Sequence, residues 1–136
     1  MKTFDELVND ADTGKKSVIR AVQAWQYLIP KATNRQLVRY DELAALMGYS
    51  DNRPLSHILN FIMVYCAQNS LPSLTGIVVN KDGTPGPGFT DASRNDLDRK
   101  REDIFSTEWF RISPPSIEEF ENAYRISKGV AHNGAA

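Results

Sequence analysis

Apolar positions in the middle of the chain repeat with the period of an α-helix. In two segments they fall at i, i+4, i+7 and i+11, which places them on one face of a helix. The first stripe consists of Val18, Val22, Trp25 and Ile29, and the second of Leu55, Leu59, Ile62 and Cys66, widened by Ile58 and Met63. We therefore expect two amphipathic helices, one from about Ser17 until Pro30 ends it, and one that opens at Pro54 and closes before Pro72.

Shorter helices are marked by their caps. Thr3 and Glu6 form a T-x-x-E capping box, and the same kind of box recurs as S-x-x-E before the last helix. Tyr40 to Met47 reads as a compact helix that Gly48 stops, since glycine suits the left-handed residue after a helix. The S-x-x-E box consists of Ser116 and Glu119, and the apolar side of the helix that follows it is lined by Ile117, Phe120 and Tyr124. A charged helix is expected around residues 91–105.

The β structure is expected to be small. Leu74 to Val79 is rich in β-branched residues and predicts a strand, and Asp82-Gly83 favours a tight hairpin turn. The return segment 84–89 is too rich in proline for a regular strand, so we expect a stiff loop whose Phe89 packs into the core. Two further short segments are Gln36 to Val38, an edge strand, and Trp109 to Ile112, a short strand or an extended docking segment.

This order of elements predicts a mainly α fold with a small β hairpin: a winged helix-turn-helix core with extra N- and C-terminal helices. We expect one domain over residues 1–128, followed by a disordered tail over 129–136. Trp25 and Tyr27 read as core and rim residues of their helix. The 136 residues, 41% apolar and 24% charged, suit a single soluble domain.

Charge and cysteine content limit the function. The net charge of −1 and pI near 6.1 argue against strong nucleic-acid binding, yet residues 13–53 hold seven basic against three acidic side chains, a net +4. Cys66 is the only cysteine, and His57 lies far from His132 in the sequence, so we expect no disulfide, metal site or cofactor. The N-terminus lacks the apolar stretch of a signal peptide, and no apolar run spans a membrane, which favours a cytoplasmic protein.

The second helix of a helix-turn-helix can enter a DNA groove, so its polar face is the candidate site. That face should present side chains that hydrogen-bond base edges and phosphates: Arg53, Ser56, His57 and Asn60. Arg39 and Tyr40 would touch the DNA backbone, and Lys81 would reach a phosphate from the hairpin. Each has an ordinary structural interpretation as well: Tyr40 as a packing residue, Arg53 as the partner of Asp51, and His57 as a surface residue.

Part of this region resembles a known family. Tyr40-Asp41-Glu42-Leu43-Ala44, Gly48, Arg53, and Ile77-Val78-Val79 with Asp82-Gly83 are similar to the DNA-binding half of alkylguanine-DNA alkyltransferases and alkyltransferase-like proteins. The resemblance covers about residues 38–89. It implies a winged-helix fold in which Arg53 intercalates where a damaged base is flipped out and Tyr40 rotates the phosphate.

The reactive group of that family is missing. If Val78 and Val79 match the family's paired valines, its nucleophilic cysteine falls at Thr75 and its neighbouring histidine at Gly76. Cys66 lies on the apolar stripe and cannot replace it, so the resemblance implies DNA binding without alkyl transfer. The chain from Leu71 onward also resembles small bacterial and phage-type proteins found beside or fused to nuclease domains, which implies no particular activity.

No catalytic constellation is recognisable. Adjacent carboxylates such as Asp41 with Glu42, or Glu118 with Glu119, point to different sides of a helix and read as helix caps rather than acid–base pairs. We therefore expect no enzyme but a duplex-DNA-binding accessory factor in bacterial or phage DNA processing or defence. The alternative is a protein-interaction module or inhibitor that uses the same scaffold to bind a partner enzyme such as a nuclease, with the acidic last helix (Glu118, Glu119, Glu121) docking a basic surface.

Overall fold

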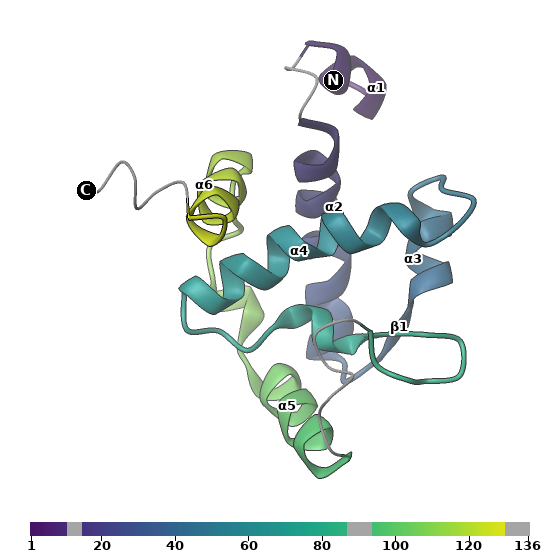
Figure 1. Cartoon of the computed structure of the whole chain (residues 1–136), viewed down its shortest axis with the longest axis vertical. Helices are drawn as coiled ribbons and strands as arrows, with labels where there is room; N and C mark the ends of the chain where they lie inside the picture. The colour runs from purple at the N-terminus through teal and green to yellow at the C-terminus, as the bar shows by residue number, and fades with distance from the viewer. Residues whose placement is uncertain (11–14, 87–93, 130–136) are drawn as a thin grey trace.

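A computed structural model describes residues 1–10, 15–86 and 94–129 of the chain, and these are mainly helical with a small β element (Figure 1). This confirms the fold class expected from the sequence at the level of helices and a minor sheet. In chain order the elements are α1 (Phe4–Asp10), α2 (Lys16–Thr33), β1 (Val38–Arg39), α3 (Tyr40–Leu46), α4 (Arg53–Gln68), η2 (Leu74–Ile77), β2 (Val78–Val79), α5 (Arg94–Ser106), η3 (Trp109–Arg111) and α6 (Ile117–Ser127).

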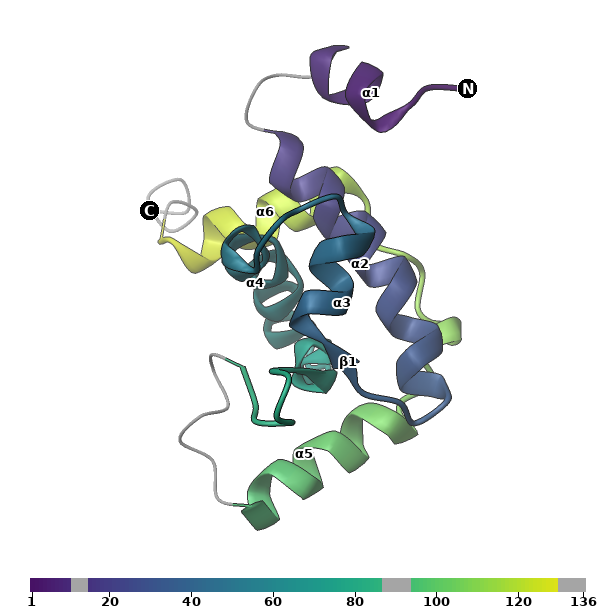
Figure 2. The same ribbon diagram turned by 90° about the vertical axis from the view of Figure 1, so that its right-hand side faces the viewer.

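Helix α4 forms the centre of the fold. It packs against α2 on one side and α6 on another, as the two perpendicular views show (Figures 1 and 2). Its apolar stripe is buried as predicted, apart from Met63, which is only partly covered. Trp25 of α2 lies beside it, in edge-to-face contact with Tyr65, Trp109 and Phe120 at centroid distances of 5.9, 5.6 and 6.2 Å. Trp25 is therefore a core residue, as expected.

The caps and turns read from the sequence are present. The hydroxyl of Ser116 accepts a hydrogen bond from the backbone N–H of Glu119, whose carboxylate accepts one from the backbone of Ser116. Thr3 accepts a similar bond from the backbone of Glu6. Gly48, which follows the C-cap residue Met47 of α3, has a φ of +79°, the left-handed conformation predicted there.

Three predictions of secondary structure were wrong. Helix α2 does not end at Pro30 but continues to Thr33, and the backbone N–H of Asn34 donates to the carbonyl of Pro30. The expected strand from Leu74 begins only at Val78, because residues 74–77 form a 3₁₀ turn. The segment from Trp109 is also a 3₁₀ turn, and Trp109 is buried in the core.

The sheet also differs from the expected hairpin. Strands β1 and β2 pair in parallel, with Val38 opposite Val78 and Arg39 opposite Val79. The hairpin after β2 is reduced to a turn and a single antiparallel bridge between Val79 and Pro85. A regular wing is therefore not seen in the residues that the structure describes. Phe89 and residues 130–136 of the predicted tail lie outside the described residues, so the predictions made for them stay predictions.

Candidate functional site

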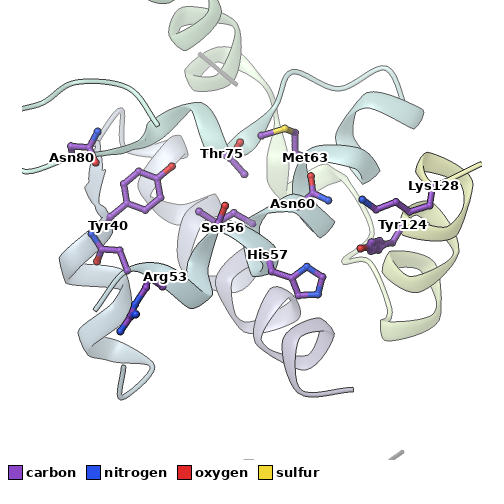
Figure 3. A pocket seen from close by; sticks show the side chains of 12 residues that line it. Tyr40, Arg53, Ser56, His57, Asn60, Met63, Thr75, Asn80, Tyr124 and Lys128 are labelled. Carbon is purple, nitrogen blue, oxygen red and sulfur yellow. The ribbon is translucent and has the colours of Figure 1, made fainter. Parts of the chain in front are cut away.

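A concavity of the described surface lies along the exposed side of α4. It is an open groove of about 620 Å³, bounded by α3 and the end of β2 at one end and by α6 at the other (Figure 3). The groove is lined by Tyr40, Asn52, Arg53, Ser56, His57, Leu59, Asn60, Met63, Thr75, Asn80, Tyr124 and Lys128. Its volume falls in the range of ligand-binding sites, about 300–1,000 Å³.

The periodicity of α4 explains which side chains reach the groove. Arg53, Ser56, His57 and Asn60 stand at i, i+3, i+4 and i+7, and so share one helical face. The opposite face is held in the core by residues such as Leu55 and Ile62, which are fully buried. The four polar side chains predicted for DNA contact are therefore brought together in one groove.

Tyr40 joins these four residues from the start of α3. Its side chain is half-buried and points across the groove towards the side of Thr75 (Figure 3). The backbone of Gly86 lies against its ring so closely that a Cβ atom on Gly86 would come within 1.8 Å of the Tyr40 hydroxyl oxygen. Burial raises the pKa of Tyr40, so its hydroxyl stays protonated and can donate a hydrogen bond.

Arg53 is tethered at the rim of the groove by a carboxylate two residues earlier. Its Nε and Nη2 donate to the two oxygens of Asp51 at 3.1 and 2.7 Å, and its backbone N–H donates to Asp51 Oδ1 at 2.9 Å. The guanidinium holds the pKa of Asp51 at about 2 through these bonds. The Arg53 side chain is nevertheless 90% exposed. Because exposed ion pairs contribute little, Arg53 can exchange its partner for an incoming phosphate.

The other two predicted residues lie outside the groove lining. Arg39 donates from Nε to Asp41 Oδ1 at 2.9 Å, and Lys81 Nζ lies 3.8 Å from Oδ2 of the same carboxylate. Hydrogen bonding to Arg39 lowers the pKa of Asp41, which keeps this carboxylate charged. Arg39, Asp41 and Lys81 form a small charged cluster beside the groove rather than in it.

Residues of α6 complete the site, and sequence reasoning missed them. Tyr124 of α6 and Lys128, the C-cap of that helix, point towards α4 (Figure 3), although more than 60 positions separate them from the α4 residues of the lining. The Tyr124 ring is in edge-to-face contact with His57 and Phe61 at 5.6 and 5.0 Å. Tyr124 was expected only as an apolar position of its helix, and no local signal pairs it with His57.

The chemistry of the lining is that of a hydrogen-bonding surface with two cations. It presents amides from Asn52, Asn60 and Asn80, together with hydroxyl groups and the imidazole of His57. Arg53 and Lys128 supply positive charge from different elements, and no Asp or Glu is among the groove-lining residues that the structure describes. Such a groove favours a ligand that is polar and neutral or negatively charged.

No cysteine is among the groove-lining residues that the structure describes. Thr75, which occupies the position that the family resemblance assigns to a reactive cysteine, does line its floor. Its hydroxyl is buried and shares a hydrogen bond of 2.8 Å with that of Ser73. Cys66 is buried elsewhere, and burial raises the pKa of its thiol to about 11, which keeps it protonated. In the described part of the chain no three His, Cys, Asp or Glu side chains gather where they could hold a metal ion.

Comparisons with models of protein families, with curated proteins and with solved structures find no match. The likeness to alkyltransferase-like proteins therefore rests on the residues quoted above alone. Over the residues that the structure describes, no helix has the length and apolar character needed to span a membrane.

Proposed function

We propose that the chain binds duplex DNA without catalysis, through the groove face of α4. The observation that supports this most directly is the lining itself: Arg53, Ser56, His57 and Asn60 share one helical face, in a groove whose described lining has two cationic residues and no carboxylate. Nucleic acid combines the two features that such a lining recognises, negative phosphates and base edges that both donate and accept hydrogen bonds.

The parts of the groove suit different parts of the DNA. Asn60 and His57 can hydrogen-bond base edges, as an Asn amide does with adenine, while the Arg53 guanidinium and the Tyr40 hydroxyl can hydrogen-bond phosphate oxygens. The groove holds a nucleotide-sized part of the duplex rather than its full width. Arg39 and Lys81 flank it and would meet phosphates further along the strand.

The test is fluorescence anisotropy of a short labelled duplex, titrated at low and moderate salt with intact and mismatched versions. Arg53→Ala should weaken binding roughly fivefold to a hundredfold and leave the melting temperature nearly unchanged. Arg99→Ala is a matched control, because Arg99 is also an exposed arginine paired with a nearby aspartate, Asp96, but on α5. If the two variants lose DNA affinity equally, the contact between DNA and α4 is contradicted. A preference for the mismatched duplex would support the alkyltransferase-like resemblance.

A protein-interaction module is the second candidate, and two observations favour it. Arg39 and Arg53 are both already paired with carboxylates, while Leu46 of α3 is 62% exposed and Phe110 is 67% exposed. The acidic side chains of α6 are less available to a basic partner than expected, because Glu121 pairs with Lys15 and Glu119 takes part in the helix cap. If the wild-type protein fails to bind DNA even at low salt, this candidate replaces the first, and Leu46→Ser should then weaken partner binding.

A further inference from the structure

A second, smaller hollow lies next to the groove on the α6 side. Its volume is about 310 Å³, and it is lined by Lys15, Phe61, Glu121, Tyr124, Arg125 and Lys128. Tyr124 and Lys128 line both concavities, so the two are neighbours with the Tyr124 side chain between them. A chain-like ligand in the groove could therefore continue into the hollow past Tyr124.

The hollow holds more positive charge than its own carboxylate can balance. Lys15 donates to both oxygens of Glu121 at 2.6 and 2.5 Å, so these two charges satisfy each other. Arg125 and Lys128 are exposed and make no ion pair with another described residue, and Lys128 Nζ lies 5.3 Å from the Tyr124 ring centroid. Two cationic side chains of the last turn of α6 and its cap are thus free to meet an anion.

Basic residues are common at the ends of helices, where they interact favourably with the helix dipole. An interaction with the helix dipole can occur on any open surface, whereas Arg125 and Lys128 border a concavity, one side of which is formed by the Tyr124 ring. Tyr124 is held by contacts with His57 and Phe61, whose own rings are 5.3 Å apart. The cations therefore stand beside a fixed aromatic wall at the exit of the groove.

We propose that this hollow is a phosphate subsite, in which Arg125 and Lys128 bind a backbone phosphate of the same DNA strand that lies in the groove. The inference rests on the proposed function and extends the interface to α6, beyond the helix-turn-helix region. The argument for a strand phosphate is charge complementarity together with continuity, because an anion seated here is adjacent to a groove lined for polar and negative groups.

The first test compares two double variants that remove the same charge. Arg125→Gln with Lys128→Gln changes the subsite, and Arg99→Gln with Arg111→Gln changes exposed arginines of α5 and η3. In anisotropy titrations between 50 and 200 mM salt, the subsite variant should bind roughly tenfold more weakly, and its log–log salt slope should become shallower by about 1 because one phosphate contact is lost. An unchanged slope, or an equal fall in the control variant, overturns the subsite. Melting temperatures show that each variant is folded.

Lysine acetylation with mass-spectrometric readout separates this inference from the proposed function. Duplex should protect Lys128 and Lys81, whereas it should not change the rate at which the control residue Lys100 on α5 is acetylated. If the duplex protects Lys81 but not Lys128, the phosphate subsite is ruled out while the proposed DNA binding by α4 is retained. No protection and no binding at low salt overturns both proposals. Equal protection of Lys128 by inorganic phosphate alone, at the same phosphate concentration, would assign the hollow to a free anion and overturn the strand phosphate.

Discussion

Gly86 offers the sharpest test of the geometry on which the site depends. A methyl group on Gly86 would lie 1.8 Å from Oη, 2.6 Å from Cζ and 2.8 Å from Cε2 of Tyr40, whereas ordinary contacts begin at 3.4 Å. Gly86→Ala therefore requires the tip of Tyr40 and the residue 86 backbone to separate by about 1.6 Å. Tyr40 is half-buried and is the first residue of α3, so it cannot move without cost.

The expected cost is that of an overpacked site, about 1–3 kcal/mol of the free energy of unfolding. For a chain of this length, a loss of that size should lower the melting temperature by roughly 3–12 °C. Urea unfolding gives the free energy directly, provided that the slope of the transition is unchanged. Because Tyr40 lines the groove, the proposed function predicts that DNA affinity falls in the same variant.

A double-mutant cycle identifies Tyr40 as the cause. Tyr40→Leu removes all three atoms that a methyl group on Gly86 would meet, so the double variant should be no less stable than Tyr40→Leu alone. If Gly86→Ala has wild-type stability, or destabilises the Tyr40→Leu background just as much, the close approach between Gly86 and Tyr40 is not real. The position of the Tyr40 side chain in the groove would then be wrong as well.

The remaining predictions concern the core and the titrating groups. Leu59→Ala or Ile62→Ala should lower the free energy of unfolding by about 2–5 kcal/mol, and Met63→Ala by less because Met63 is partly exposed; equal losses in urea titrations would contradict the assigned buried face. The Cys66 thiol, with its pKa raised to about 11, should react with Ellman's reagent at pH 8 only after unfolding, and immediate reaction in the native protein would show that it is accessible. The pKa of Asp51 is lowered from its ordinary value of 3.8 to about 2, so its contribution to stability is present above pH 4 and lost as the pH falls towards 2. The difference in melting temperature between the wild type and Asp51→Asn should therefore shrink over that range, and a constant difference would contradict the hydrogen bonds that the Asp51 carboxylate accepts from the Arg53 side chain and backbone.

The sequence predicts well those parts of the fold that depend on local spacing. The stripe from Leu55 to Cys66 is buried because its spacing matches the helical period, and the same spacing puts Arg53 and Asn60 on the opposite side. The cap at Ser116 and the left-handed Gly48 follow from the chemistry of single residues and their neighbours. Such features need no knowledge of the rest of the chain.

The failures arise where tertiary packing overrides local preference. Leu74 to Ile77 has a composition typical of a strand, yet the segment is fully buried as a 3₁₀ turn, and the carbonyl of Gly76 accepts a hydrogen bond from Arg101 Nε at 3.3 Å. Pro30 lies in the last turn of α2, where it removes only one hydrogen bond, and the burial of Ala32 favours continuing the helix. The local composition of these segments indicates neither the hydrogen bond between Arg101 and Gly76 nor the burial of Ala32.

The same distinction applies to the electrostatics of the site. Arg39 and Arg53, the arginines that sequence reasoning selected, each have an aspartate two positions away in the chain, and the structure shows both pairs formed. Such pairs present little net field at a distance, which agrees with the near-neutral charge of the protein. Arg125 on α6 and Lys128 at the C-cap of that helix have no such described partner. If DNA approaches this face, its long-range attraction should therefore come mainly from α6, while Arg53 acts at close range by exchanging Asp51 for phosphate. The salt dependence of the association rate should then be reduced more by the α6 double variant than by Arg53→Ala.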